Sequence, residues 1–251
     1  MTQDRFYMLV LILVMLFPVP VVADQLAVEV AKEQIDVTVG FDGSSVELFG
    51  NRRDKDSDVL IVIQGPKKDI TIWEKKRVMG TWVNRYFVTY YDMPVYYHYA
   101  SSLSGKVTDN VDMIMRHNGV GHDSLFSSLR IKKSESLKGT QKFEQDLLKK
   151  KQEHGVYFSK PADIKFINDH FFRVRFEIPA SAQTGEYVIR SLLIKEGQII
   201  TEHKTKLWVK QVGINAFLNH AATQHSFAYA FACIFLALFF GWFSSVVKVR
   251  P

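Results

Sequence analysis

The feature that most constrains this chain is an apolar block close to its C-terminus. Residues 227–247 form a run of 21 residues without a charged side chain. A helix needs about 20 apolar residues to cross a bilayer core, and soluble helices of that length that are apolar on every side are unusual. Lys248 and Arg250 follow the block, and basic residues at this position mark the cytoplasmic side. The sequence therefore predicts a transmembrane helix with a cytoplasmic tail.

A second apolar block, residues 6–23, lies near the N-terminus. Arg5 precedes it, Pro18 and Pro20 interrupt it, and it ends in Val-Val-Ala23. This pattern is typical of a secretory signal peptide that is cut after Ala23. The alternative is an uncleaved second membrane helix, because the block is just long enough to span. The prolines favour cleavage, since they stand where the apolar part of a signal peptide should end.

Together the two blocks predict a single-pass protein of the inner (plasma) membrane, with most of the chain in the periplasm. Cys233, the one cysteine of the chain, falls inside the predicted membrane helix. The exported part therefore has no disulfide and must be stabilised by core packing. The net charge of +6 is small for 251 residues. Export and this weak charge argue against nucleic acid as a partner, whereas the predicted membrane helix makes the lipid bilayer one expected partner.

The exported part has mainly strand patterns. Residues 34–49 resemble a hairpin with a turn at Asp42-Gly43, and residues 59–63 form a continuous apolar run that fits a strand buried on both faces. Apolar residues alternate with charged ones over 172–178, and a second hairpin is expected over 187–209 with a turn at Glu196-Gly197.

Two further patterns refine the fold class. Three amphipathic pieces between residues 106 and 158 predict a helical insertion. The spacing from Pro179 through Gly185 to Tyr187 is similar to an immunoglobulin-like corner, in which the tyrosine hydroxyl bonds the backbone upstream, although simple packing of Tyr187 is the alternative.

The expected class is mainly β (α+β), with immunoglobulin-like β-sandwich halves, a central helical insertion and one C-terminal transmembrane helix. The predicted segments are a signal peptide (1–23), an N-terminal β domain (24–105), the helical insertion (106–158), a C-terminal β section (159–213), a juxtamembrane segment (214–226), the membrane helix (227–247) and the cytoplasmic tail (248–251).

Several sequence blocks also resemble one family. These are VELFGNRRD, VLIVIQGP, KRVMGTWVN, MPVYYHYASS, FFRVRFEIPASAQTGEYVIRSLLIKEGQII and a C-terminal block that ends in GWFSSVV. In this order they resemble a family of alphaproteobacterial transmembrane proteins over nearly the whole mature chain. At residues 101–104 the chain has Ser-Ser-Leu-Ser, where family members tend to carry an arginine-proline pair. The resemblance implies the topology, and a genomic association with anion permeases of the sulfite-exporter type, but no activity.

No motif in the sequence indicates catalysis. The chain contains neither a Gly-x-Ser-x-Gly elbow nor a phosphate-binding Gly-x-x-x-x-Gly-Lys loop, and no histidine pair has the spacing of a zinc enzyme. His117 and His122 flank two glycines, but no third ligand is close to them in the sequence. We therefore expect a non-enzymatic protein with no cofactor and no metal site.

Two sets of residues are candidates for contact with a partner. An aromatic stretch places rings on both faces of a strand, so some should be exposed unless both faces are covered. Four small residues at a spacing of four share one face of the membrane helix, where a second helix could approach closely, or they simply face lipid. The aromatic candidates are Trp82, Tyr90, Tyr91, Tyr96 and Tyr97, and the helix-packing candidates are Cys233, Ala237, Gly241 and Ser245.

These observations favour an interaction or accessory subunit of an envelope complex. The expected partner is another membrane protein, with a transporter as one candidate. The alternative is a periplasmic binding module for a small anion or a carbohydrate, which would use the aromatic stretch.

Overall fold

The computed structural model describes residues 25–103, 109–213, 218 and 221–246. The predicted signal peptide, the cytoplasmic tail and residues 214–217 and 219–220 of the predicted juxtamembrane segment lie outside the described residues.

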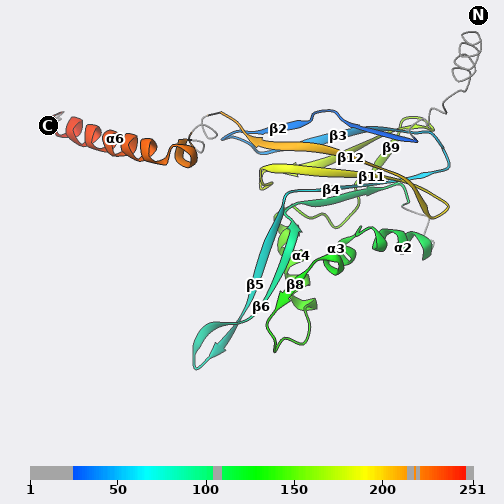
Figure 1. The fold of residues 1–251 in the computed structure, drawn as a ribbon, viewed down its shortest axis with the longest axis horizontal. Helices are drawn as coiled ribbons and strands as arrows, with labels where there is room; N and C mark the ends of the chain where they lie inside the picture. The colour runs from blue at the N-terminus through cyan, green and yellow to red at the C-terminus, as the bar shows by residue number, and fades with distance from the viewer. Residues whose placement is uncertain (1–24, 104–108, 214–217, 219–220, 247–251) are drawn as a thin grey trace, which may run out of the picture.

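Two sheets pack face to face and form a β-sandwich (Figure 1). The first is antiparallel throughout, with the order β1 (Leu26–Val30), β3 (Gly43–Arg52), β10 (Phe171–Pro179), β9 (Ile164–Phe166). The second has the order β2 (Gln34–Val37), β12 (Gln198–Gln211), β11 (Gly185–Lys195), β4 (Asp58–Gln64), β7 (Tyr97–Ser101), in which only β2 runs parallel to its neighbour.

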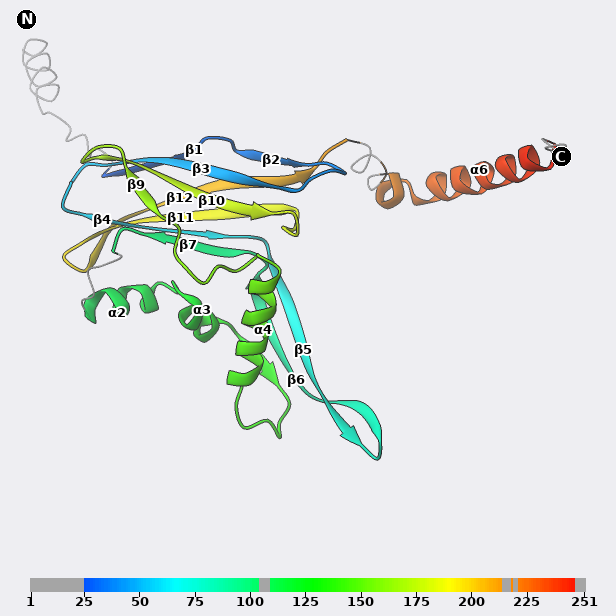
Figure 2. The same ribbon diagram turned by 180° about the vertical axis from the view of Figure 1, so that it is seen from behind.

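Helices cover the outer face of the second sheet, so the domain has three layers (Figure 2). These helices are α2 (Asp109–His117) and α3 (His122–Ser128), whereas α4 (Gln141–Glu153) runs beside β5 (Lys67–Val78) and β6 (Thr81–Pro94). The mainly β class with a central helical insertion is thus confirmed. Each sheet contains strands from before and after the insertion, so the two β sections of the sequence build one sandwich together.

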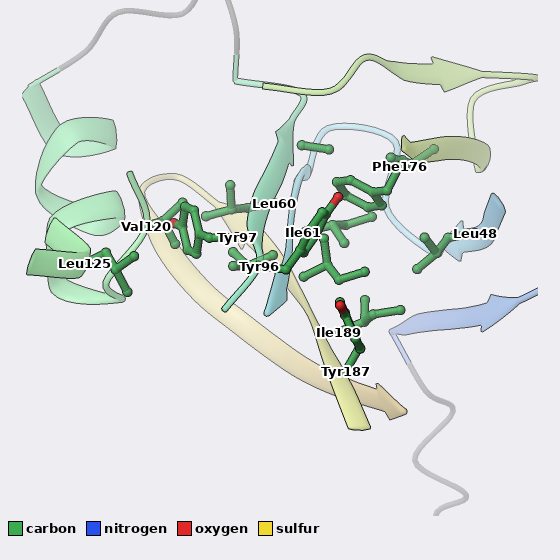
Figure 3. Close-up of a cluster of buried hydrophobic side chains, with 14 of the residues drawn as sticks. Leu48, Leu60, Ile61, Tyr96, Tyr97, Val120, Leu125, Phe176, Tyr187 and Ile189 are labelled. Atoms are coloured by element: carbon green, nitrogen blue, oxygen red, sulfur yellow. The ribbon is translucent and has the colours of Figure 1, made fainter. Parts of the chain in front are cut away.

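Strand β4 lies in the second sheet, which is the middle layer, and is buried on both faces. All five residues from Val59 to Ile63 are at most 1% exposed. Figure 3 shows Leu60 with Tyr97 on the side of the helical layer and Ile61 on the side of the first sheet. This confirms the prediction from the continuous apolar run, because a strand covered on both faces has no reason to alternate.

Strand β10 shows the opposite pattern, in which one face is buried and the other faces solvent. Phe172, Val174, Phe176 and Ile178 are buried, while the residues between them are exposed or half-buried. The alternation predicted over residues 172–178 is therefore confirmed.

The hairpin β11–β12 and the corner before it are also confirmed. Glu196 and Gly197 form the turn with φ of 49° and 80°, which fits the two-residue hairpin turns that need positive φ at both positions. At the corner, the Tyr187 hydroxyl donates a hydrogen bond to the carbonyl oxygen of Gln183 at 2.9 Å, as the immunoglobulin-like spacing suggested.

The predicted hairpin over residues 34–49 is wrong. Strand β2 pairs in parallel with β12 in the second sheet, and β3 lies in the first sheet between β1 and β10. Both segments are strands, but the chain crosses between the sheets at residues 38–42. Alternation identifies a strand and its buried face, and it carries no information about which strand is the neighbour.

The C-terminal helix α6 (Ser226–Val246) stands apart from this core. Its apolar part, Ser226–Ser245, is 0% buried. Among the described residues, α6 is the one helix that is long and apolar enough to cross a membrane. The residues of the hydrophobic core lie between Leu26 and Val209. A chain that ends at Gly213 therefore keeps the whole described core, and the domain of residues 25–213 contains what it needs to fold.

Gly50 of β3 provides a test of the sandwich packing. A Cβ atom at Gly50 would lie 2.1 Å from Cζ of Phe172, which is fully buried. Overpacking of this kind costs about 1–3 kcal/mol. We expect Gly50→Ala to lower the free energy of unfolding of the 25–213 domain by this amount in urea denaturation. Gly139→Ala is the control, because Gly139 has open space around its Cα. Equal stability of the two variants would contradict the packing of Phe172 across β3.

Candidate interaction surfaces

A two-stranded arm leaves the sandwich as the continuation of two core strands. Strand β4 continues into β5 (Lys67–Val78), and β6 (Thr81–Pro94) continues into β7. The pairing persists through the bend, where Gly65 N–H donates to Tyr96 O and Val95 N–H donates to Pro66 O, both at 2.9 Å. The arm therefore rests on the most deeply buried strand of the protein and projects away from the sandwich (Figures 1 and 2).

The base of the arm is fixed by packing on its inner side. Strand β8 (Ile131–Lys133) adds a third strand beside β6, and Val88 and Tyr90 of β6 are fully buried. The Tyr90 ring packs edge-on against the ring of Phe126 in α3, with the ring centres 5.6 Å apart. The Lys142 ammonium of α4 donates to the Glu74 carboxylate at 2.8 Å and thereby lowers the pKa of that carboxyl group. The arm is thus held in place up to Glu74.

Beyond Glu74 the arm is free on all sides. Its turn, Met79-Gly80, has φ of 49° and 83°, and every residue from Lys75 to Arg85 is exposed. This exposed tip combines apolar and basic side chains and contains no acidic residue. Its apolar members are Val78, Met79, Trp82 and Val83, and its basic members are Lys75, Lys76, Arg77 and Arg85.

Three of the five aromatic residues predicted to form a partner surface are buried. Tyr90, Tyr96 and Tyr97 are 0% exposed, so this part of the prediction is wrong. The Tyr96 hydroxyl donates to Glu177 O at 2.7 Å inside the sandwich. On the opposite face, the Tyr97 hydroxyl accepts a hydrogen bond from Gly121 N–H at 2.8 Å. Both faces of this strand are covered, which the sequence pattern alone could not show.

The other two aromatic candidates reach the surface on β6. Trp82 is 67% exposed in the tip of the arm. Tyr91 is half-buried at the base, where the guanidinium of Arg130 lies 5.3 Å from the centre of its ring. The five residues therefore do not form one surface. Trp82 lies instead among the apolar and basic residues of the tip.

The four small residues of α6 share one side of a helix that no described part of the chain covers. Cys233, Ala237, Gly241 and Ser245 are all exposed, and no atom outside the helix lies within 4 Å of the position a Cβ would take on Gly241. Bulky side chains such as Phe235 and Phe239 occupy other positions around the helix. The role of the four small residues in helix packing remains a prediction.

A basic pocket of about 450 Å³ lies between β10 and the segment that follows α4. Its lining includes the buried imidazole of His98 and four basic side chains, together with Asp163 and Glu177. His98 stacks on Phe158 at 3.9 Å, and its Nε2 lies 3.3 Å from the carbonyl oxygen of Lys160. Burial lowers the pKa of His98 to about 4. The basic lining residues are Lys160, Lys165, Arg173 and Arg175.

Within the described residues, no three His, Cys, Asp or Glu side chains lie close enough together to hold a metal ion. The His122 ring stacks on Tyr157 with the ring centres 6.0 Å apart.

The comparisons with known proteins define the class of this chain. Residues 25–250 match the family described as "Putative transmembrane protein (Alph_Pro_TM)". The chain belongs to this family of transmembrane proteins, and its helix α6 makes it a membrane-anchored protein. This confirms the resemblance found in the sequence blocks.

No curated protein sequence matches the chain. One solved structure that matches is titled "Structural basis of T cell specificity and activation by the bacterial superantigen toxic shock syndrome toxin-1". The matching chain is 9% identical, with 74% of this chain and 99% of that chain covered and a TM-score of 0.26. A likeness this low supports no inference about this protein.

The buried His98 predicts a pH dependence of stability. Its pKa is about 4 in the folded protein, below the ordinary 6.5, so the unfolded chain takes up the proton first as the pH falls. The stabilisation from this group is complete above about pH 6.5 and is lost as the pH falls towards 4. In thermal unfolding of the 25–213 domain, we expect His98→Phe to show a smaller fall in Tm between pH 7 and pH 4.5 than the wild type. His154→Gln, which changes an exposed histidine, should leave the slope unchanged. Parallel curves for wild type and His98→Phe would contradict the prediction.

Proposed function

We propose that this protein is a non-enzymatic accessory subunit of the inner membrane, whose helix α6 binds another membrane protein. The observation that carries the proposal is the uncovered α6 with small residues along one face. Without bulky side chains on that face, the backbone of a second helix can approach closely and gain dispersion contacts. A transporter is one candidate for the partner.

The proposed orientation places the β domain in the periplasm. The signal-like N-terminus supports export of the domain, and Lys248 and Arg250 support a cytoplasmic C-terminus. In this orientation, the β domain can contact the periplasmic part of a partner membrane protein.

Gly241→Leu tests the helix contact. No atom of the described residues outside α6 lies within 4 Å of the Cβ position at Gly241, so the variant should fold and insert as the wild type does. If a second helix packs at Gly241, leucine separates the two backbones and weakens the association. The measurement is co-purification of membrane proteins with the full chain in mild detergent, at equal expression. We expect Gly241→Leu to lose most of the co-purifying protein.

Leu238→Ile is the matched control, because Leu238 lies outside the small-residue face and the change keeps its volume. It should retain the wild-type association. Equal recovery of partners with wild type and Gly241→Leu would reduce α6 to an anchor and move any contact to the exported domain.

A second candidate function is the binding of a small anion, and the observation that favours it is the basic pocket beside His98. Arg173 and Lys165 line it without an ion-pair partner among the described salt bridges, whereas Arg175 is paired with Glu47. A ligand that binds only the folded state raises Tm.

The 25–213 domain should show a higher Tm in sulfate than in chloride of equal ionic strength, and this rise should be smaller in Arg173→Gln. Sulfate also stabilises proteins by exclusion from their surface. An equal rise in the variant would therefore mean that the pocket binds no anion.

A further inference from the structure

We propose that the tip of the arm, residues 75–85, is a second membrane contact that binds the anionic phospholipid surface of the bilayer in which α6 is anchored. This contact uses a different element from the helix contact proposed above, and neither depends on the other.

The order of side chains along the tip matches the layers of a membrane interface. The outermost residue, Met79, is fully exposed and Val78 beside it is 41% exposed, so apolar side chains would enter deepest. Trp82 comes next, and indole rings prefer the headgroup layer. Arg77 lies directly across from Trp82, and Lys76 lies one residue farther from the turn, so that their long stems can lie along apolar surface while their charges reach the phosphates.

The charge of the tip is complementary to an anionic surface. Four basic side chains lie between Lys75 and Arg85 with no acidic residue among them. The nearest carboxylate, Glu74, is already paired with Lys142 of α4. Each basic residue close to an anionic membrane strengthens binding by roughly fivefold. The tip therefore favours anionic lipid over neutral lipid.

The distribution of these side chains favours lipid over a protein partner. Arg77 pairs with Trp82 across the strands, and Lys76 pairs with Val83. Because successive residues of a strand point to opposite faces, one face carries the first pair and the other face carries the second. A docked protein covers one continuous patch, whereas headgroups surround an inserted tip on all sides. The arm offers similar chemistry on both faces.

The arm also reaches towards the correct end of the molecule. In both views its tip lies level with the beginning of α6 along the long axis, and the turn between β3 and β4 lies at the opposite end (Figures 1 and 2). The base of the arm is fixed by β8, by α4 and by the buried Val88. A rigid base presents the tip without a large loss of conformational entropy on binding.

Site-specific fluorescence of the full chain in vesicles tests this contact. Cys233→Ser removes the native thiol, and Met79→Cys then carries an environment-sensitive NBD label. The vesicles contain phosphatidylethanolamine and phosphatidylglycerol, with or without brominated acyl chains. We expect a blue-shifted emission that brominated lipid quenches. Lys55→Cys in the turn between β3 and β4 is the control site and should show neither effect.

Removing basic charges from the tip then distinguishes binding of anionic lipid from mere closeness of the tip to the membrane. Lys76→Gln with Arg77→Gln should reduce the inserted fraction relative to the free fraction by roughly tenfold or more, as should replacement of phosphatidylglycerol by phosphatidylcholine. The matched control is Lys149→Gln with Lys150→Gln on the exposed side of α4, which should change nothing. An unquenched, unshifted label at Met79→Cys would overturn the proposal, and so would insertion that is indifferent to both charge changes.

Discussion

The burial of strand β4 on both faces is the constraint on which the rest of the structure depends. An apolar strand without alternation needs cover above and below. The first sheet covers one face, and the helical layer of α2 and α3 covers the other (Figure 3). This requirement explains why a helical segment interrupts the β sections and why strands from both sections share each sheet. It also gives the arm a rigid origin, because β5 is the continuation of β4.

Two apolar elements remain outside this packing, namely the tip of the arm and α6. Both are exposed in the described structure, and exposed apolar surface of this extent indicates contact with a partner or a membrane. The family and the length of α6 assign that helix to the membrane. The basic residues around the apolar tip favour an anionic surface as its partner. The proposed accessory function rests on α6, and the proposed contact with anionic lipid rests on the tip.

The sequence predicted local structure well because local structure has a local signal. Alternation identified β10, the turn residues Glu196-Gly197 identified the β11–β12 hairpin, and helical spacing identified α2, α3 and α4. Pairing partners have no such signal, so the expected hairpin over 34–49 was wrong. For the same reason the aromatic candidates were divided: Trp82 is exposed, whereas Tyr96 and Tyr97 lie on opposite faces that are both covered. The sequence analysis did not identify the tip, although basic and apolar residues without an acid surround Met79-Gly80.

In the proposed topology, a single helix crosses the membrane and holds the β domain on the periplasmic side. The most direct test is labelling of spheroplasts with a membrane-impermeant maleimide, in chains that carry Cys233→Ser and one new cysteine. We expect Lys55→Cys to react in intact spheroplasts and Val249→Cys, in the C-terminal tail, to react only after lysis. Reaction of Lys55→Cys only after lysis, or of Val249→Cys before it, would contradict the proposed topology.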